Sequence, residues 1–141
     1  MDVTALENLR LAGVVASQFT HRSEAPVIGE VWLRFETLTV NLGVAADWEL
    51  RIDSEEPREG YVMEELGSRV DVIAAPDEVP FVRYIGQRLR RLVEEFDDLS
   101  GQRMRMAFEF EDGAVIARSW GGDLQMTHVS TASENGPSSD A

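Results

Sequence analysis

The chain has 141 residues and no cysteine, which excludes disulfides, thiolate metal sites and a cysteine nucleophile. Twenty-six acidic residues face thirteen basic ones, for a formal net charge of −13. Such a charge repels a phosphate backbone and attracts basic partners, so we expect no nucleic-acid partner. No apolar run approaches the roughly 20 residues of a membrane span, and the N-terminus does not resemble a secretory signal. We therefore expect a cytoplasmic protein that does not bind membranes.

All thirteen basic residues are arginines, and the chain contains no lysine. A high-GC genome produces this bias, because arginine codons replace lysine codons. Adaptation to high salt also raises acidity and lowers lysine content, and the sequence leaves both explanations open.

The N-terminal part predicts a short helix followed by a strand. Thr4 and Glu7 have the spacing of a capping box, which places a helix over about 5–9. The small and β-branched residues of 11–20 favour a strand, and 21–26 form a polar turn.

Period-two alternation over 30–53 is the clearest pattern in the chain. Apolar residues occupy every second position in three successive runs: Val31, Leu33 and Phe35; Leu38, Val40 and Leu42; Trp48, Leu50 and Ile52. This alternation indicates antiparallel strands with one face packed on a core and the other in solvent.

The middle of the chain is less regular. Residues 53–60 are an acidic turn region that contains a proline. Residues 61–66 fit either a short helix stopped by Gly67 or an irregular excursion, and 69–74 fit a strand that ends before Pro76.

One long amphipathic helix is predicted over about 79–98. Its apolar residues fall within about 120° of a helical wheel; they are Phe81, Ile85, Leu89, Leu92, Val93 and Phe96. Asp77 can cap the start, Pro80 fits the first turn, and Gly101 lies where a left-handed residue ends a helix. We expect this helix to cover the apolar face of the sheet.

The pattern of 31–52 recurs over 106–128. Each segment reads as a strand, a tight turn, a second strand, a small-residue loop and a third strand, with Asp47 matching Asp123. Asp112-Gly113 predicts a two-residue hairpin turn, and Gly121-Gly122 a second tight turn. We thus predict an α+β domain over 1–128, a mainly antiparallel sheet built from two three-stranded units, and a disordered tail over 129–141.

Charges along the predicted helix oppose its dipole. Four arginines precede four acids, which are Glu94, Glu95, Asp97 and Asp98. Acids near a helix C-terminus cost roughly 0.3–1 kcal/mol each. Either these acids form a surface for a basic partner, or mildly unfavourable surface charges are tolerated here.

Trp32 and Arg34 form a second candidate surface. Trp32 lies on the polar side of its strand, beside Arg34, and an exposed tryptophan among charges is typical of a binding hot spot. The alternative is that the N-terminal strand or the 53–67 segment covers it.

We identify no catalytic, cofactor-binding or metal-binding residues from the sequence. His21 and His128 are the only histidines and lack metal-site spacing, and the paired carboxylates lie mostly in solvated positions. His128 matches Ile52 in the repeat, which favours a partly buried structural role.

The leading functional hypothesis is a non-enzymatic acidic protein-binding domain, such as an immunity or antitoxin-type inhibitor of a basic effector. It rests on the small size, the net charge of −13 and the lack of a catalytic motif. One alternative is a self-associating structural or accessory module that forms a homo-oligomer. Another is a hydrolase that uses carboxylates with His21 or His128.

Overall fold

The computed structural model describes residues 1–130, which form ten strands and three short 3-10 helices. The helices are η1 (Val3–Leu6), η2 (Glu64–Leu66) and η3 (Pro80–Tyr84). The strands are β1 (Leu11–His21), β2 (Val27–Phe35), β3 (Thr39–Val44), β4 (Leu50–Ser54), β5 (Tyr61–Met63), β6 (Ser68–Ala74), β7 (Leu89–Phe96), β8 (Arg103–Phe110), β9 (Gly113–Trp120) and β10 (Asp123–Ser130). The α+β prediction is therefore wrong, because this part of the chain is nearly all antiparallel sheet. None of its helices is long and apolar enough to span a bilayer.

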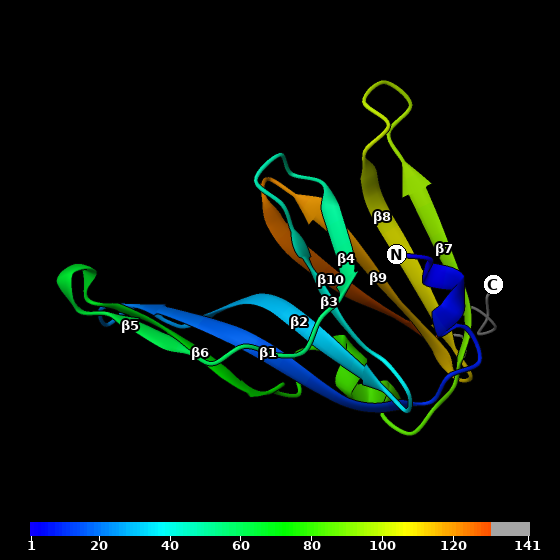
Figure 1. Cartoon of the computed structure of the whole chain (residues 1–141), viewed down its shortest axis with the longest axis horizontal. Coiled ribbons are helices and arrows are strands. Elements are labelled where there is room, and N and C mark those ends of the chain that lie inside the picture. Colours follow the sequence, from blue (N-terminus) through cyan, green and yellow to red (C-terminus); the bar gives the residue numbers. More distant parts are fainter. Residues whose placement is uncertain (131–141) are drawn as a thin grey trace, which may run out of the picture.

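The strands form two sheets rather than the single sheet that we expected. The large sheet has six strands in the order β4-β3-β2-β1-β6-β5, and the small sheet has four in the order β10-β9-β8-β7. Every strand pairing is antiparallel, as the alternation predicts. The two sheets face each other around one core (Figure 1).

The two similar sequence segments fold as separate meanders. Residues 31–52 run through β2, β3 and β4 of the large sheet, and 106–128 run through β8, β9 and β10 of the small sheet. Each meander turns its alternating apolar residues toward the same core. The two units thus form opposite layers of a sandwich.

The predicted helix over 79–98 is the main error, and a β-bulge explains it. Leu89 and Leu92 are both buried although they are three residues apart, because the pairing with β8 shifts register between Leu89 and Arg91. A bulge inserts one extra residue into a strand, so two inward positions move from i, i+2 to i, i+3. That spacing is the one that indicates a helix in a sequence.

Two other residues of the predicted apolar stripe do not face the core. Ile85 is 44% exposed and Phe96 is 52% exposed. Gly86 interrupts the segment with φ at +96°, a conformation that glycine adopts readily and that no helix accommodates. Only the start of the segment, η3, is helical, with Phe81 buried under it.

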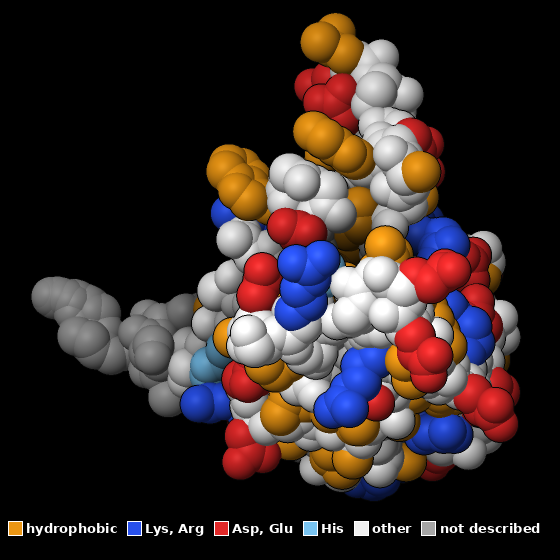
Figure 2. All heavy atoms as spheres, turned by 90° about the vertical axis from the view of Figure 1, so that its left-hand side faces the viewer, with side chains coloured by type: hydrophobic (Ala, Val, Ile, Leu, Met, Phe, Trp, Pro, Cys, Tyr) orange, Lys and Arg blue, Asp and Glu red, His pale blue; other side chains and the backbone are white. Residues whose placement is uncertain are grey.

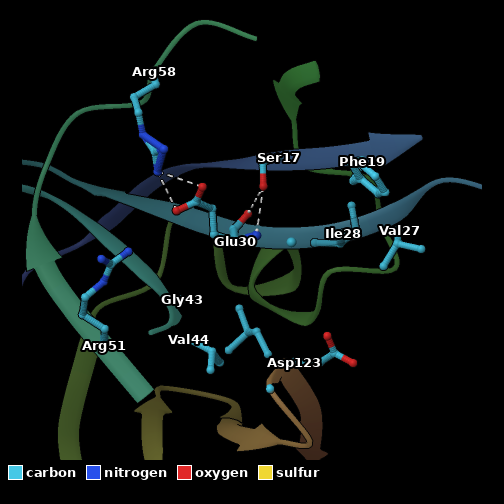
Figure 3. A pocket seen from close by; sticks show the side chains of 13 residues that line it. Ser17, Phe19, Val27, Ile28, Glu30, Gly43, Val44, Arg51, Arg58 and Asp123 are labelled. Carbon is cyan, nitrogen blue, oxygen red and sulfur yellow. Dashed lines mark hydrogen bonds and ion pairs between the residues drawn. The ribbon is translucent and has the colours of Figure 1, made fainter. Parts of the chain in front are cut away.

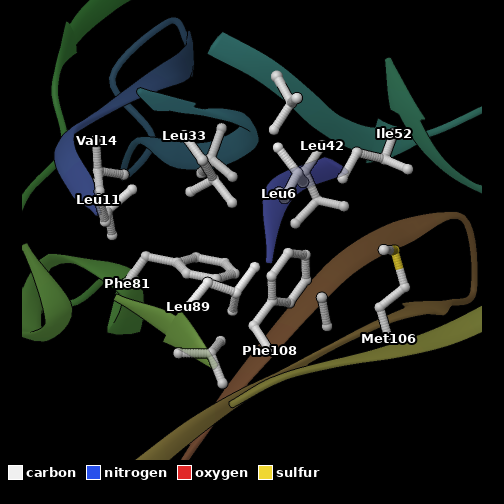
Figure 4. Close-up of a cluster of buried hydrophobic side chains, with 14 of the residues drawn as sticks. Leu6, Leu11, Val14, Leu33, Leu42, Ile52, Phe81, Leu89, Met106 and Phe108 are labelled. Atoms are coloured by element: carbon white, nitrogen blue, oxygen red, sulfur yellow. The ribbon is translucent and has the colours of Figure 1, made fainter. Parts of the chain in front are cut away.

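The core takes side chains from both sheets and from two of the short helices (Figure 4). Phe108 of β8 meets Phe81 of η3 edge to face, with ring centroids 5.0 Å apart. The other large, fully buried aliphatic side chains are Leu6, Leu11, Leu33, Leu42, Leu50, Leu89 and Met106.

The N-terminal segment ties the two sheets together at one corner. The amide of Leu11 donates to the carbonyl of Gln87, and the amide of Leu89 donates to that of Leu9. Asp2, not Thr4, caps η1, and the Glu7 carboxylate accepts the Leu92 amide instead of closing a capping box. That bond satisfies an amide beside the β7 bulge, which helps to fix the bulge in place.

The large sheet extends beyond the core as an arm, which projects to the left in Figure 1. We define the arm as residues 17–21, 27–29 and 61–74, which belong to β1, β2, β5, η2 and β6. Because β4 and β5 lie on opposite edges of the sheet, residues 55–60 must cross its outer face. We call this crossing segment the strap.

The C-terminal strand ends later than expected. β10 continues to Ser130, two residues into the predicted tail, and 131–141 lie outside the described residues. The Glu111-Asp112 pair makes the turn before β9, and Gly113 is the first residue of that strand. A Cβ on Gly113 would lie 2.8 Å from the Val129 carbonyl oxygen and would also overlap the Tyr84 hydroxyl.

Replacing Gly113 with alanine should therefore destabilise the fold. We expect Gly113→Ala to lower the free energy of unfolding by about 1–3 kcal/mol, the usual cost of overpacking. Gly13→Ala is the matched control, since a Cβ there would only touch Arg34 carbon atoms at 3.8 Å or more. Urea unfolding of both variants measures the difference, and equal stabilities would contradict the packing argument.

Candidate functional site

A polar network covers the outer face of β2, β3 and β4. One nitrogen of Arg58 on the strap, Nη2, donates to both Glu30 carboxylate oxygens, at 2.7 and 2.8 Å. Asn41 Nδ2 donates to Glu30 Oε1 at 2.9 Å, and Arg51 Nη2 donates to Asn41 Oδ1 at 3.2 Å. The bond to Glu30 raises the pKa of the Arg58 guanidinium. The network therefore holds the strap on the sheet by charge-assisted hydrogen bonds.

Next to this network lies an open pocket of about 530 Å³ (Figure 3). Ser17, Glu30, Arg51 and Arg58 line one side, and Asp123 at the start of β10 approaches from the other. The carboxylates and guanidiniums balance, and Glu30 is already bonded to Arg58. The pocket thus offers no single charge that would select a ligand.

Trp32 is buried under the strap and is not the exposed hot spot that we considered. Its relative exposure is 1%, and the guanidinium carbon of Arg58 lies 5.3 Å from its ring centroid. This geometry is a cation–π contact. The alternative that the 53–67 segment covers Trp32 is the one that the structure adopts. Its indole nitrogen is buried without a hydrogen-bond partner among residues 1–130.

Arg34 lies on the same outer face and pairs with the strap. Its Nη1 atom is 3.3 Å from Glu56 Oε1 in an exposed ion pair. Such pairs contribute little to stability, about 0–1 kcal/mol. Arg34 and Trp32 therefore share a face, and the strap crosses that face.

The four acids predicted as one surface are spread over β7 and its turn. Glu94 pairs with Arg103 at 2.7 Å in a mostly buried position, and Glu95 pairs with Arg105. Adjacent strand residues point to opposite faces, so Glu94 and Glu95 cannot form one surface. Asp97 and Asp98 lie in the turn before β8, where both are exposed.

Asp97 also has a structural role in that turn. Its Oδ2 atom accepts the amide of Ser100 at 2.8 Å and the amide of Leu99 at 3.2 Å. The bond from Ser100 lowers the pKa of the Asp97 carboxyl. Its negative charge is thereby retained, and the turn presents Leu99 at 98% exposure.

Three connections meet at one end of the sandwich, which we call the loop end. They are residues 45–49, residues 97–102, and the turn 121–122 with Asp123, the first residue of β10 (Figure 1). Gln102 Nε2 donates to the Asp47 carbonyl at 3.3 Å, and the Arg103 amide donates to Glu49 Oε2 at 3.0 Å. Together with Asp123, these three connections hold five carboxylates and no arginine.

Exposed apolar side chains concentrate at the loop end and just beside it. Trp48 is 58% exposed, Leu99 98% and Trp120 62%. Trp48 lies against the β9–β10 turn, since a Cβ on Gly122 would be 3.3 Å from its indole nitrogen. Phe96, Trp120 and Met104 line a shallow hollow with the side chains of Arg105 and Arg118. In the space-filling view, apolar side chains stand out on the projecting parts of the molecule (Figure 2).

Trp48 has a strained backbone, with φ at +72°. The Trp48 amide donates to the Ala45 carbonyl at 2.8 Å, and the Ala45 amide donates to the Glu49 carbonyl at 2.9 Å. In such a hairpin the left-handed position is normally glycine. A bulky residue with positive φ is an outlier, and residues held in such conformations cluster at functional sites. Trp48 is therefore the strongest local signal of function in this structure.

The sequence analysis missed both exposed tryptophans. We expected Trp48 to point inward with Leu50 and Ile52, but the left-handed turn rotates it out of that alternation. Trp120 could have been found, because Val115, Ala117 and Ser119 are the inward residues of its strand. The opposite phase places Trp120 on the outside.

The two histidines contact hydroxyl groups in different parts of the fold. His21 Nδ1 is within hydrogen-bond distance of Ser68 Oγ on the arm, and His128 Nε2 is 2.7 Å from the Tyr84 hydroxyl. Burial lowers the pKa of His128, with a further contribution from Arg83, and burial raises the pKa of Tyr84. Among residues 1–130, no group of three or more potential metal ligands lies together.

No protein-family model, curated protein or solved structure matches this chain significantly, so its function must be inferred from its own geometry.

Removing the Arg58 side chain should uncover Trp32. In a background with Trp48→Phe and Trp120→Phe, only Trp32 fluoresces, and we expect blue-shifted emission with little acrylamide quenching. Arg58→Ala should shift this emission to longer wavelength and increase quenching several-fold, because the guanidinium over the ring is lost. Arg69→Ala removes an exposed ion pair on the arm and should leave the emission unchanged. If the emission of Trp32 stayed blue-shifted and weakly quenched in Arg58→Ala, Arg58 would not be what covers Trp32.

His128 should make stability depend on pH in the weakly acidic range. Its pKa is lowered in the fold, so the unfolded chain takes up the proton more readily. Neutral His128 therefore stabilises the fold fully above the pKa of histidine in the unfolded chain, about 6.5. This stabilisation is lost as the pH falls toward the lower pKa of His128 in the folded protein. Urea unfolding between pH 7.5 and 5.5 should therefore show a smaller decline for His128→Gln than for the wild type. Identical declines would show that His128 does not carry the effect.

Proposed function

We propose that this protein is a non-enzymatic acidic protein-binding domain whose loop end binds a basic protein. The observation that carries the proposal is that the loop end holds exposed Trp48 and Leu99 together with five carboxylates and no arginine. Tryptophan anchors ringed by charge are typical of binding hot spots. Loops held by a rigid scaffold are also where binding residues are most often found.

The charge of the whole chain supports a basic partner. A formal net charge of −13 speeds encounter with a basic protein and makes the association depend on salt. The proposed surface includes Asp97 and Asp98, whereas Glu94 and Glu95 are paired with arginines and contribute less.

The narrower form of the proposal is an immunity or antitoxin-type inhibitor in the cytoplasm. Effectors that bind nucleic acid contact phosphates through arginine and lysine side chains. An acidic loop end would occupy such a surface and exclude the phosphate backbone. The small size and the acidity of the chain support this form.

Capture of the partner from the native host tests the proposal. The wild type and the double variant Trp48→Gly/Leu99→Ser serve as baits at low and high salt, with Val62→Ser on the arm as the control. We expect one basic protein that the wild type and the control retain, that the double variant loses and that high salt weakens. A complex indifferent to salt, or equal capture by all three baits, would contradict the proposal.

Trp48→Gly should separate binding from stability. Glycine adopts positive φ without strain, so we expect the free energy of unfolding to stay within about 1 kcal/mol of the wild type. Affinity for the purified partner should fall at least tenfold, as expected for a hot-spot tryptophan. Calorimetric titration beside urea unfolding measures both effects, and unchanged affinity would remove Trp48 from the interface.

A further inference from the structure

One face of the arm carries a continuous set of uncharged side chains. Residues paired directly across an antiparallel sheet point to the same face. Val27 pairs with Phe19, Phe19 with Val70, and Val70 with Tyr61, so these four form one row across four strands. The flanking rows on this face are Ser17 with Val72, and His21 with Ser68 and Met63.

This arm face is exposed in part, and within it Ser17 and Ser68 are buried. Phe19 is 39% exposed, Val27 61% and Tyr61 57%. Phe19 also stacks on His21, with ring planes inclined by 8°. The strap borders this face: Arg58 lines a pocket with Ser17 and Phe19, and a Cβ on Gly60 would lie 2.4 Å from the Val70 carbonyl oxygen. The opposite face of the same strands is mixed: it carries Gln18, Thr20, Arg69 and Asp71 together with Ile28, Val62 and Ile73.

We propose that the arm face is a self-association surface for a second copy of this chain. The nine residues of the three rows include no acid and no arginine, in a chain of which 28% is charged. Two copies that each carry a net charge of −13 repel each other, so they can meet closely only where charge is absent. A basic partner would gain no electrostatic attraction from this neutral face. A second copy of the chain is therefore the favoured occupant of the arm face.

A two-fold axis through the row Val27–Phe19–Val70–Tyr61 makes the contact self-complementary. Strands lie about 4.8 Å apart and same-face residues about 6.8 Å apart, so nine positions cover roughly 300 Å². Stable interfaces bury about 800 Å² per partner. The contact is therefore weak, and we expect a dissociation constant on the order of 100 μM.

The test is sedimentation equilibrium from about 10 μM to 1 mM, with circular dichroism to verify folding. The wild-type mass should rise from 15.7 kDa toward twice that value over this range. Tyr61→Ser and Phe19→Ser should each weaken association at least tenfold. Val62→Ser is the matched control, since Val62 follows Tyr61, is 64% exposed and points to the opposite face; it should leave association unchanged.

Salt distinguishes this surface from the loop end. Screening reduces repulsion between like-charged copies, so added salt should strengthen the dimer, whereas it should weaken binding of a basic partner. Trp48→Gly should leave dimerisation intact. The proposal is overturned by a wild type that stays monomeric at 1 mM, by equal effects of Val62→Ser and Tyr61→Ser, or by a dimer that Trp48→Gly abolishes.

Discussion

The contact of Arg58 with Glu30 and Trp32 determines which surfaces of this protein stay open. The strand order places β4 and β5 on opposite edges of the large sheet, so the chain has to cross the outer face between them. Arg58 fixes that crossing by pairing with Glu30 and lying over the Trp32 ring. The central outer face is thereby covered without a second layer of secondary structure. The arm face and the loop end are among the surfaces that remain exposed.

The sequence was a good guide wherever the strands are regular. Alternation placed β2, β3 and β4 almost correctly, and the small β-branched run of 11–20 is β1. The failure at 79–98 has a local cause. The bulge near Leu89 produces a spacing of three between buried residues, which a sequence pattern cannot tell from a helical turn. Gly86 within that segment was the one local signal against a helix, since glycine destabilises a helix interior.

The candidate site was harder to predict than the fold. Alternation states which face a side chain takes, but whether that face is covered depends on distant parts of the chain. Trp32 lies on the outer face as its phase indicates, yet the strap buries it. Trp48 occupies an inward position in the alternating pattern, yet its left-handed backbone conformation directs the side chain outward. Asp97 and Asp98 were identified by their charge. The β7–β8 turn in which they lie was not predicted, because the segment before it was predicted as a helix.

Charge separates the two exposed surfaces and gives them different roles in our proposals. The loop end combines carboxylates with tryptophans, which suits a basic protein, and the arm face is neutral, which suits a second acidic chain. The two surfaces approach each other at the pocket beside Glu30, which Phe19 and Val27 of the arm face line together with Asp123 of the loop end. A weak dimer through the arm would present two loop ends together, and linked sites raise apparent affinity without any new contact. Such a gain requires a partner that is itself multivalent. A monovalent basic effector would be bound equally well by the monomer, so the need for the arm face depends on the architecture of the partner.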